Sequence, residues 1–463
     1  MTATAPPTAN LYDVLTERGL VAQCTESDDA IRRRLGEPAT RPVTAYCGFD
    51  PTADSLHLGH LVPVMALAHL QRAGHRPLAV VGGATGMVGD PSGKSEARNM
   101  LDEATLRHNV ECVGRQLGQF LSFGQGPTDA LLLNNYDWIR PLSWLEVLRD
   151  IGSKMSVNRM LSMESVKQRV SRDIPVISAG GNISAGGSIK AGGTIKAGGS
   201  ISAGADINAN TGISYLEFSY MLLQAYDFTY LHREHSCTLQ VGGQDQWGNI
   251  VMGIELGRKM DDAELAGLTC PLVTKSDGGK FGKTESGAVW LDAERTPVFE
   301  FFQFWRNVAD ADVGKYLGYF TFLPMDEVRA LSSAQGKDIN AAKVRLAFEV
   351  TKLVHGEAEA TKARDAAGGA FSAAGPDVTG ESIPSAELSA DELAAGPGVL
   401  DLLVRAGLAK SKGEARRLVQ GGGVRVHDAK VADVGHTLGP DDAVDGYVLL
   451  RAGKKRLFRF DVV

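Results

Sequence analysis

The sequence predicts an α/β protein with a parallel sheet, followed by an α-helical domain and a small α+β module at the C-terminal end. Three short β-rich runs, at 43–49, 77–83 and 130–134, predict the sheet. A turn and an apolar helical pattern at 61–70 follow the first run, so the local order is strand, turn, helix. Because alternating β and α elements build parallel sheets, we expect the carboxyl ends of these strands to line a crevice.

The composition divides the chain into four successive parts. Residues 1–295 carry the α/β pattern, and an aromatic helical pattern predicts a second domain at 296–356. Residues 357–396 are rich in Ala, Gly, Ser and Pro, which indicates a partly helical linker. The module at 397–463 holds 12 Lys and Arg against 8 Asp and Glu, in a chain with a formal net charge of −7. A basic module on an acidic body suggests a local polyanion contact, although charge alone favours a solvated surface.

The bulk properties are those of an ordinary globular protein. Of the 463 residues, 43% are hydrophobic and 22% are charged. Since no apolar run is long enough to cross a bilayer and no signal peptide is evident, we expect a cytoplasmic protein without membrane contact. The five cysteines are scattered without the spacing of a zinc site or a disulfide framework, so we expect reduced thiols and no bound metal.

A six-residue repeat fills the segment 174–211, which also has no residue types suited to catalysis. Alanine stands two places after each of its isoleucines, Ile177, Ile183, Ile189, Ile195, Ile201 and Ile207. Such repeats stack as a small parallel β-solenoid, here with two coils of eighteen residues. Two coils are close to the minimum for stacked repeats, so a flexible loop is the alternative. In either case we expect a surface protrusion that leaves the surrounding core intact.

The segment 57–60, with the sequence His-Leu-Gly-His, follows the first predicted strand and the turn at 50–52. This order places its glycine where a backbone approaches a ligand, and both histidines at the start of a helix, where α/β folds bind phosphates. The segment 280–284, Lys-Phe-Gly-Lys-Thr, adds two further cations far along the chain. Together the two segments predict one nucleotide site.

These motifs resemble those of the bacterial tyrosyl-tRNA synthetases, which are class I aminoacyl-tRNA synthetases. Residues 46–60 and 280–284 are similar to the two signatures of the family, and residues 218–228 and 239–249 to its amino-acid and ribose pockets. The resemblance implies a Rossmann-like nucleotide-binding catalytic domain, a helical anticodon-region domain and an S4-like RNA-binding domain at 397–463. It extends over nearly the whole chain outside the repeat.

The resemblance also implies the reaction. The enzyme would activate L-tyrosine with ATP to tyrosyl-adenylate and pyrophosphate, and would then transfer tyrosine to the terminal adenosine of tRNA(Tyr). ATP would be a substrate accompanied by Mg²⁺, with no tightly bound cofactor. A homodimer is implied, with its interface in the segment 144–163.

Three sets of site residues follow from the resemblance. The catalytic set, which stabilises charge on the triphosphate, is His57, His60, Lys280, Lys283, Thr284, Lys94 and Arg98. The tyrosine-binding set is Tyr46, Asp90, Tyr220, Gln224, Asp227 and Gln246. The ATP-binding set is Gly48, Asp50, Thr52, His57, Gly59, His60, Gly242, Asp245 and Lys283.

The spacing of its residues along the chain independently supports the tyrosine-binding set. Tyr220, Gln224 and Asp227 are four and three residues apart, so on a helix they project from one face. By resemblance, Tyr46 and Asp227 meet the phenolic hydroxyl of tyrosine. A site that hydrogen-bonds a hydroxyl rejects the analogue without it by roughly 10⁴ to 10⁵, so no editing domain is needed.

Two other functions remain to be distinguished. Tryptophanyl-tRNA synthetases share the fold and signatures, but the pair of Tyr46 and Asp227 suits a phenol better than an indole. A catalytically retired synthetase acting as an RNA-binding or splicing protein is the second, and the intact signatures argue against it.

The sequence departs from the family pattern at Gln244, beside the adenylate pocket, and at His427-Asp428 in the C-terminal module.

Overall fold

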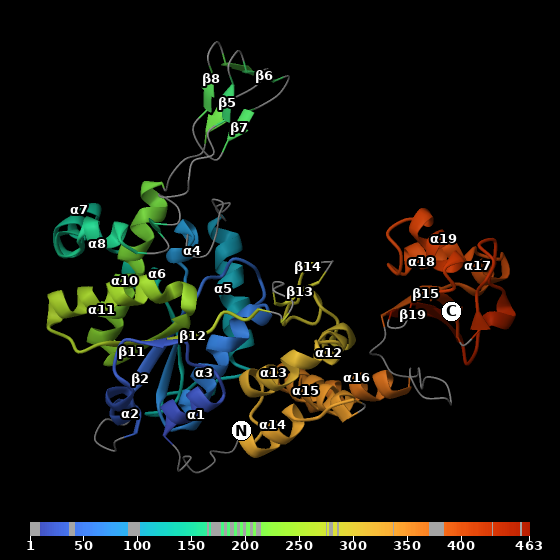
Figure 1. Cartoon of the computed structure of the whole chain (residues 1–463), viewed down its shortest axis with the longest axis horizontal. Helices are drawn as coiled ribbons and strands as arrows, with labels where there is room; N and C mark the ends of the chain where they lie inside the picture. The colour runs from blue at the N-terminus through green and yellow to red at the C-terminus, as the bar shows by residue number, and fades with distance from the viewer. Residues whose placement is uncertain are drawn as a thin grey trace. The chain divides into compact units, whose positions relative to one another are not determined.

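The computed structural model describes most of the chain (Figure 1), which divides into two compact units. The described residues are 10–36, 42–90, 102–163, 166–167, 214–274, 276, 281–284, 287–336, 338–369, 384–427, 429–453 and 456–463, and six short strands between 177 and 209. One unit comprises Met1–Leu291 and Gly314–Ala330, and the other Asp292–Val313 and Leu331–Val463.

The first unit is built on a six-stranded sheet, which confirms the predicted α/β fold. Its strands, in spatial order, are β1 (Gln23–Cys24), β12 (Ala266–Cys270), β11 (Cys237–Gly243), β2 (Thr44–Phe49), β3 (Arg76–Val81) and β4 (Leu131–Asn134). All neighbouring pairs are parallel except β1 with β12, which is antiparallel. Every residue of β12 is buried, as expected for a strand covered on both faces.

The strand order determines where a ligand can bind. Along the chain the sheet grows from β2 through β3 to β4, and then resumes on the other side of β2 with β11 and β12. The order therefore reverses between β2 and β11. In open parallel sheets, ligands bind outside the carboxyl ends of the strands at this switch point.

Helices and short helical turns connect these strands. The α-helices are α1 (Leu11–Glu17), α2 (Asp28–Gly36), α3 (Leu61–Arg72), α4 (Thr85–Val88), α5 (Glu103–Leu117), α6 (Tyr136–Ile139), α7 (Trp144–Glu146), α8 (Val157–Leu161), α10 (Tyr215–His235) and α11 (Trp247–Asp261). The tighter or wider turns are η2 (Leu58–His60), η3 (Val147–Ile151), η4 (Gly152–Lys154) and η5 (Gln244–Gln246). The helix predicted at 61–70 is α3, which packs against β2, β3 and β11.

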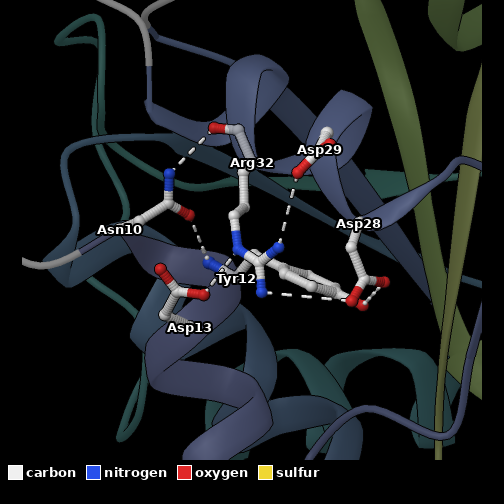
Figure 2. A network of polar contacts seen from close by, with 6 residues as sticks. All are labelled: Asn10, Tyr12, Asp13, Asp28, Asp29 and Arg32. Carbon is white, nitrogen blue, oxygen red and sulfur yellow. Dashed lines mark hydrogen bonds and ion pairs between the residues drawn. The ribbon is translucent and has the colours of Figure 1, made fainter.

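Polar contacts join helices α1 and α2 (Figure 2). The Asn10 side chain accepts from the Tyr12 backbone N–H at the start of α1, and donates to the Arg32 carbonyl in α2. The Tyr12 hydroxyl donates to Asp28 over 2.9 Å, and the Arg32 guanidinium donates to Asp13 over 2.7 Å. Strand β1 lies between these helices in sequence. It was not predicted, because its hydrogen bonds come from the distant strand β12.

A buried arginine fixes residues 314–330 to the first unit, although the sequence analysis placed them in the helical domain. The Arg18 guanidinium donates to the carbonyls of Gly318, Thr321 and Leu323 over 3.3, 2.8 and 2.6 Å. The helices of this region are α12 (Val298–Arg306), η6 (Asp310–Asp312), α13 (Val313–Phe320), α14 (Met325–Ser332), α15 (Asp338–His355) and α16 (Glu357–Gly369). In the second unit, α12 packs on α15 and α16.

The C-terminal module combines helices with a five-stranded sheet. The sheet order is β15 (Ser385–Leu388), β19 (Arg456–Val462), β18 (Tyr447–Ala452), β16 (Val424–Val426) and β17 (Ala429–Lys430). The helices are α17 (Ala390–Ala394), α18 (Val399–Arg405), α19 (Lys412–Gln420) and η7 (Pro440–Asp442). His427 has a φ of +48°, in the left-handed region where an Asn-Gly-type turn is common. The chain therefore makes this turn with histidine.

The repeat contributes six strands, for which only the backbone is described. They are β5 (Ile177–Ala179), β6 (Ile183–Ala185), β7 (Ile189–Ala191), β8 (Ile195–Ala197), β9 (Ile201–Ala203) and β10 (Ile207–Ala209). They form three parallel pairs, β5 with β8, β6 with β9, and β7 with β10. Each isoleucine pairs with the isoleucine eighteen positions away, for example Ile177 with Ile195. This is the register of coils that are eighteen residues long.

Candidate active site

A cavity of about 370 Å³ opens at the switch point of the sheet. Thirteen of the predicted residues line it, namely Tyr46, Gly48, Asp50, His57, Gly59, His60, Asp90, Tyr220, Gln224, Asp227, Gly242, Asp245 and Gln246. Thr52 is exposed in the turn after β2 and does not line the cavity, and neither does Gln244. Lys94, Arg98 and Lys280 lie outside the described residues. For Lys283 and Thr284, only the backbone of β13 (Lys283–Thr284) is described.

The two histidines of the first signature hold each other at the start of α3. The His57 backbone N–H donates to Nδ1 of His60 over 3.1 Å, and the Gly59 N–H donates to Nδ1 of His57 over 3.0 Å. Their rings stack with centroids 3.9 Å apart. Since a nitrogen that accepts a hydrogen bond carries no proton, both neutral rings have their N–H at Nε2. A Cβ on Gly59 would lie 2.8 Å from the His57 ring, so only glycine fits there.

Backbone hydrogen bonds bring the second signature to the first. The Val289 N–H donates to the Gly282 carbonyl over 2.8 Å, and the Leu58 N–H donates to the Val289 carbonyl over 3.1 Å. A Cβ on Gly282 would lie 3.1 Å from Cβ of Leu58. Val289 follows the short hairpin of β13 and β14 (Gly287–Ala288). Two distant parts of the sequence are thus in direct contact, as the nucleotide-site prediction requires.

A buried polar group around Asp227 lines part of the cavity. Its carboxylate accepts from Nε1 of Trp138 over 2.8 Å and from Nδ2 of Asn135 over 3.1 Å. Burial raises the pKa of Asp227 to about 7, and these two hydrogen bonds oppose the rise. The Tyr46 hydroxyl and Oε1 of Gln224 are buried without a hydrogen-bond partner among the residues that the structure describes. Buried polar atoms of this kind suit a ligand that supplies the missing bonds.

Carboxylates line the part of the cavity near Gln246 and Tyr220. Nε2 of Gln246 donates to Asp90 over 2.5 Å, and Oε1 of Gln246 accepts from Asn249 over 3.0 Å. The Tyr220 hydroxyl donates to Asp50 over 3.1 Å. Burial, followed by the charges of nearby carboxylates, raises the pKa of Tyr220 well above its usual value, so the phenol stays protonated. These carboxylates make this end of the cavity suitable for a cation.

The structure places Tyr220, Gln224 and Asp227 on α10, and all three line the cavity, as their helical spacing predicted. The sequence analysis missed Asn135 and Trp138, which bind the Asp227 carboxylate. Both follow β4, the third predicted strand, so their place at a strand's carboxyl end was the available signal. Other lining residues that it did not assign include Cys47, Thr85 and Gln240.

Glycine makes room for a ligand at the end of β2. Gly48 is exposed within this otherwise buried strand, and a Cβ built there meets no atom within 4 Å.

Among the described residues, no group of three or more His, Cys, Asp and Glu is arranged to hold a metal ion. Within the same residues, no helix is long and apolar enough to cross a membrane.

Family models match most of the chain. The model described as tRNA synthetases class I (W and Y) matches residues 38–181 and 200–372, and therefore omits eighteen residues of the repeat. The model described as tyrosine–tRNA ligase SYY-like C-terminal domain matches residues 377–460.

Curated relatives and solved structures agree with these matches. A tyrosine–tRNA ligase of Clostridium perfringens is 45% identical over 447 residues, covering 96% of this chain and 98% of the relative. One from Clostridium botulinum is 43% identical over 454 residues, covering 98% and 100%. The crystal structure of a C-terminally truncated mitochondrial tyrosyl-tRNA synthetase from Aspergillus nidulans has a TM-score of 0.61 and 29% identity, covering 77% of this chain and 92% of that chain.

Proposed function

Because the chain belongs to the class I tyrosyl-tRNA synthetases and ligates tyrosine to tRNA with ATP, we propose that the residues of the cavity carry out this reaction in the roles given below. The observation that carries the proposal is the buried group at Asp227. There the Asp227 carboxylate lines one cavity with the Tyr46 hydroxyl and the Gln224 oxygen, neither of which has a hydrogen-bond partner among the described residues. That cavity lies at the switch point of the sheet.

Tyr46 and Asp227 recognise the phenolic hydroxyl of tyrosine. The hydroxyl donates to the Asp227 carboxylate and accepts from the Tyr46 hydroxyl, which has no other partner among the described residues. Asn135 and Trp138 position the carboxylate by donating to its two oxygens. Phenylalanine would leave these groups unpaired, and the resulting penalty gives the selectivity.

Tyr220, Gln224 and Asp90 bind the ammonium group of the substrate, and Gln246 contributes through its hydrogen bond to Asp90. The supporting observation is the concentration of negative charge on this side of the cavity. The unpartnered oxygen of Gln224 supplies a further acceptor for an N–H donor. The substrate carboxylate is then directed towards the nucleotide.

The nucleotide lies against the ends of β2 and β11. Gly48, where an added Cβ would meet no atom within 4 Å, lets the sugar approach the backbone. Gly242 and Asp245 bind the ribose, and Asp50 and Thr52 belong to the turn beside it. His57 and His60 donate from Nε2 to the triphosphate, since Nδ1 of each ring accepts a backbone N–H. We assign Lys94, Arg98, Lys280, Lys283 and Thr284 to the same charge stabilisation, by family resemblance.

Activation is an in-line displacement. A carboxylate oxygen of tyrosine forms a bond to the α-phosphorus of ATP as the bond to the pyrophosphate oxygen breaks, and pyrophosphate leaves with the electron pair. Preorganised donors stabilise the charge that develops on the departing group, so no covalent enzyme intermediate is needed. Mg²⁺ enters bound to the phosphates of ATP. In the second step a hydroxyl of the terminal ribose of tRNA attacks the tyrosyl carbonyl, and AMP leaves.

The remaining parts of the chain bind tRNA and a second subunit. The basic module at 397–463 contacts the tRNA, and we assign the enzyme to the cytoplasm, in keeping with its similarity to bacterial tyrosine–tRNA ligases. The segment 144–163 forms a homodimer interface, because it exposes large apolar side chains, among them Trp144, Leu145 and Leu148 at 56%, 76% and 45%. A monomeric sedimentation profile at micromolar concentration would contradict this interface. The repeat at 174–211 is an insertion that protrudes from the catalytic domain.

Tyrosine-dependent ATP–pyrophosphate exchange tests the proposed site. We expect exchange with tyrosine, and a kcat/KM for phenylalanine lower by about 10⁴ to 10⁵. Tyr46→Phe should reduce the ratio of kcat/KM for tyrosine to kcat/KM for phenylalanine by roughly tenfold, since it removes one hydrogen bond to the hydroxyl. Tyr12→Phe is the matched control, because Tyr12 lies on α1 and its hydroxyl donates to Asp28 rather than lining the cavity.

The alternatives give different results in the same assay. Exchange with tryptophan instead of tyrosine, or no exchange at all, would contradict the proposed function. An unchanged ratio in the Tyr46→Phe enzyme would contradict the role given to Tyr46.

A further inference from the structure

One helix contacts both ends of the segment that leads into the second signature. Nζ of Lys315, on α13, donates to the Thr274 carbonyl over 2.8 Å. At the other end, the Phe281 ring lies 4.9 Å from the Tyr316 ring and stacks on the Phe320 ring, with centroids 5.6 Å apart and planes 4° from parallel. Phe281 is the second residue of the signature. We propose that α13 positions the second signature for catalysis, through Lys315, Tyr316 and Phe320.

The contact surface on α13 is rigid. Tyr316 and Phe320 are four residues apart on one helical face, and each is at most 1% exposed. Nζ of Lys315 lies 4.9 Å from the centre of the Tyr316 ring, a cation–π arrangement that favours the rotamer from which it reaches Thr274. Close packing holds such side chains in single rotamers, so they define a fixed position for Phe281.

The far end of α13 is anchored to the catalytic unit. The buried Arg18 guanidinium binds the carbonyls of Gly318, Thr321 and Leu323. Removing a partner from a buried charged hydrogen bond is costly, so α13 is not free to shift against α1. The helix therefore holds Phe281 in a fixed position relative to the sheet.

Phe281 is linked to the first signature through its chain neighbour Gly282. Gly282 is adjacent to Phe281, it packs against Leu58, and its carbonyl is linked to Leu58 through Val289. Leu58 lies between His57 and Gly59 in the nucleotide-binding turn. A shift of the Phe281 ring would thus alter the separation of the two signatures. Since charge stabilisation depends on donors placed to within a fraction of an ångström, such a shift lowers the rate of chemistry more than it lowers tyrosine binding.

This inference rests on the proposed roles of Lys280 and Lys283, and it is tested with the full chain. Lys315→Met removes the hydrogen bond to Thr274 and keeps most of the apolar stem. We expect kcat for tyrosine-dependent ATP–pyrophosphate exchange to fall roughly tenfold, with tyrosine affinity and the thermal midpoint unchanged. Lys315→Arg retains a donor and should restore most of the activity. Arg329→Met is the control, because it breaks only an exposed ion pair with Glu17.

A second readout does not depend on activity. Trypsin cleaves after lysine, and Lys280 directly precedes Phe281, whose ring contacts α13. In the Lys315→Met protein we expect cleavage after Lys280 to be roughly threefold to tenfold faster, since one attachment of the segment is lost. Phe281→Leu, which removes the ring but keeps an apolar side chain, should have the same two effects.

The outcomes separate the inference from the proposed function. Exchange and cleavage rates within about twofold of wild type in both variants would overturn the role of α13. So would a parallel loss of tyrosine affinity and thermal midpoint, which indicates a structural effect only. A wild-type chain without exchange would contradict the proposed function, and the cleavage rates would still decide whether α13 holds the segment.

Discussion

At the scale of single residues, Asp227 has an unusual protonation equilibrium. Its carboxyl is fully buried, and burial raises its pKa to about 7, while Asn135 and Trp138 donate hydrogen bonds that favour the charged form. The negative charge of Asp50 adds to the rise. The group is therefore partly protonated at neutral pH. A phenol that donates to the carboxylate favours the ionised form, so tyrosine binding and ionisation are linked.

This linkage predicts the pH dependence of tyrosine binding. Tyrosine affinity should increase roughly tenfold between pH 6 and pH 8, because the carboxyl must lose its proton before it can accept from the phenol at full strength. Fluorescence titration of the enzyme with tyrosine measures the dissociation constant at each pH. In Asp227→Asn the affinity should be lower and independent of pH over this range. A wild-type affinity that stays constant from pH 6 to pH 8 would be inconsistent with the assigned role.

At the scale of elements, short segments between the helices and strands bring the two signatures together. Gly282 has a φ of +68°, a conformation that favours glycine, and its α-carbon faces Leu58. The first signature is built as a single turn, η2, in which two imidazoles replace the usual capping side chains. The site thus depends on backbone conformations at these few positions.

Gly282→Ala tests this dependence. The left-handed conformation costs an alanine about 1 kcal/mol, and its Cβ would press on Leu58 at 3.1 Å, so the signatures should move apart. We expect kcat for pyrophosphate exchange to fall about tenfold with little change in tyrosine affinity. Gly336→Ala is a matched control, since Gly336 has a φ of +60° and no atom within 4 Å of the added Cβ. Equal activity of the two variants would show that contact with Leu58 is unimportant.

At the scale of the whole molecule, the family model leaves part of the repeat unmatched. The model omits residues 182–199, which is the length of one coil in the observed strand register. Each of the six strands pairs with another strand of the repeat. Since these pairings are internal, the sheet of the catalytic unit does not need the repeat for its hydrogen bonds.

Deletion of residues 174–211 should therefore leave activation intact. We expect exchange within about twofold of wild type, because the signatures and the α10 residues are held by contacts outside this segment. The measurement is tyrosine-dependent exchange on a deletion protein whose folding is checked by its thermal transition. Loss of exchange in a folded deletion protein would show that the repeat maintains the geometry of the site.

The sequence predicts the alternation of strands and helices, the two signatures, and the polar face of Tyr220, Gln224 and Asp227. These features depend on the spacing of neighbouring residues, which local geometry translates directly into structure. The motifs in it were also sufficient to predict the family, which the family model and the curated relatives confirm.

The folded structure was needed to learn how these parts meet. It showed that Asn135 and Trp138 bind Asp227, that Val289 links Gly282 to Leu58, and that the Phe281 ring contacts α13. It also paired β1 with β12 and grouped residues 314–330 with the catalytic unit. Each of these contacts joins residues that are distant in the chain. Their partners are set by the packing of the whole unit, so no local pattern identifies them.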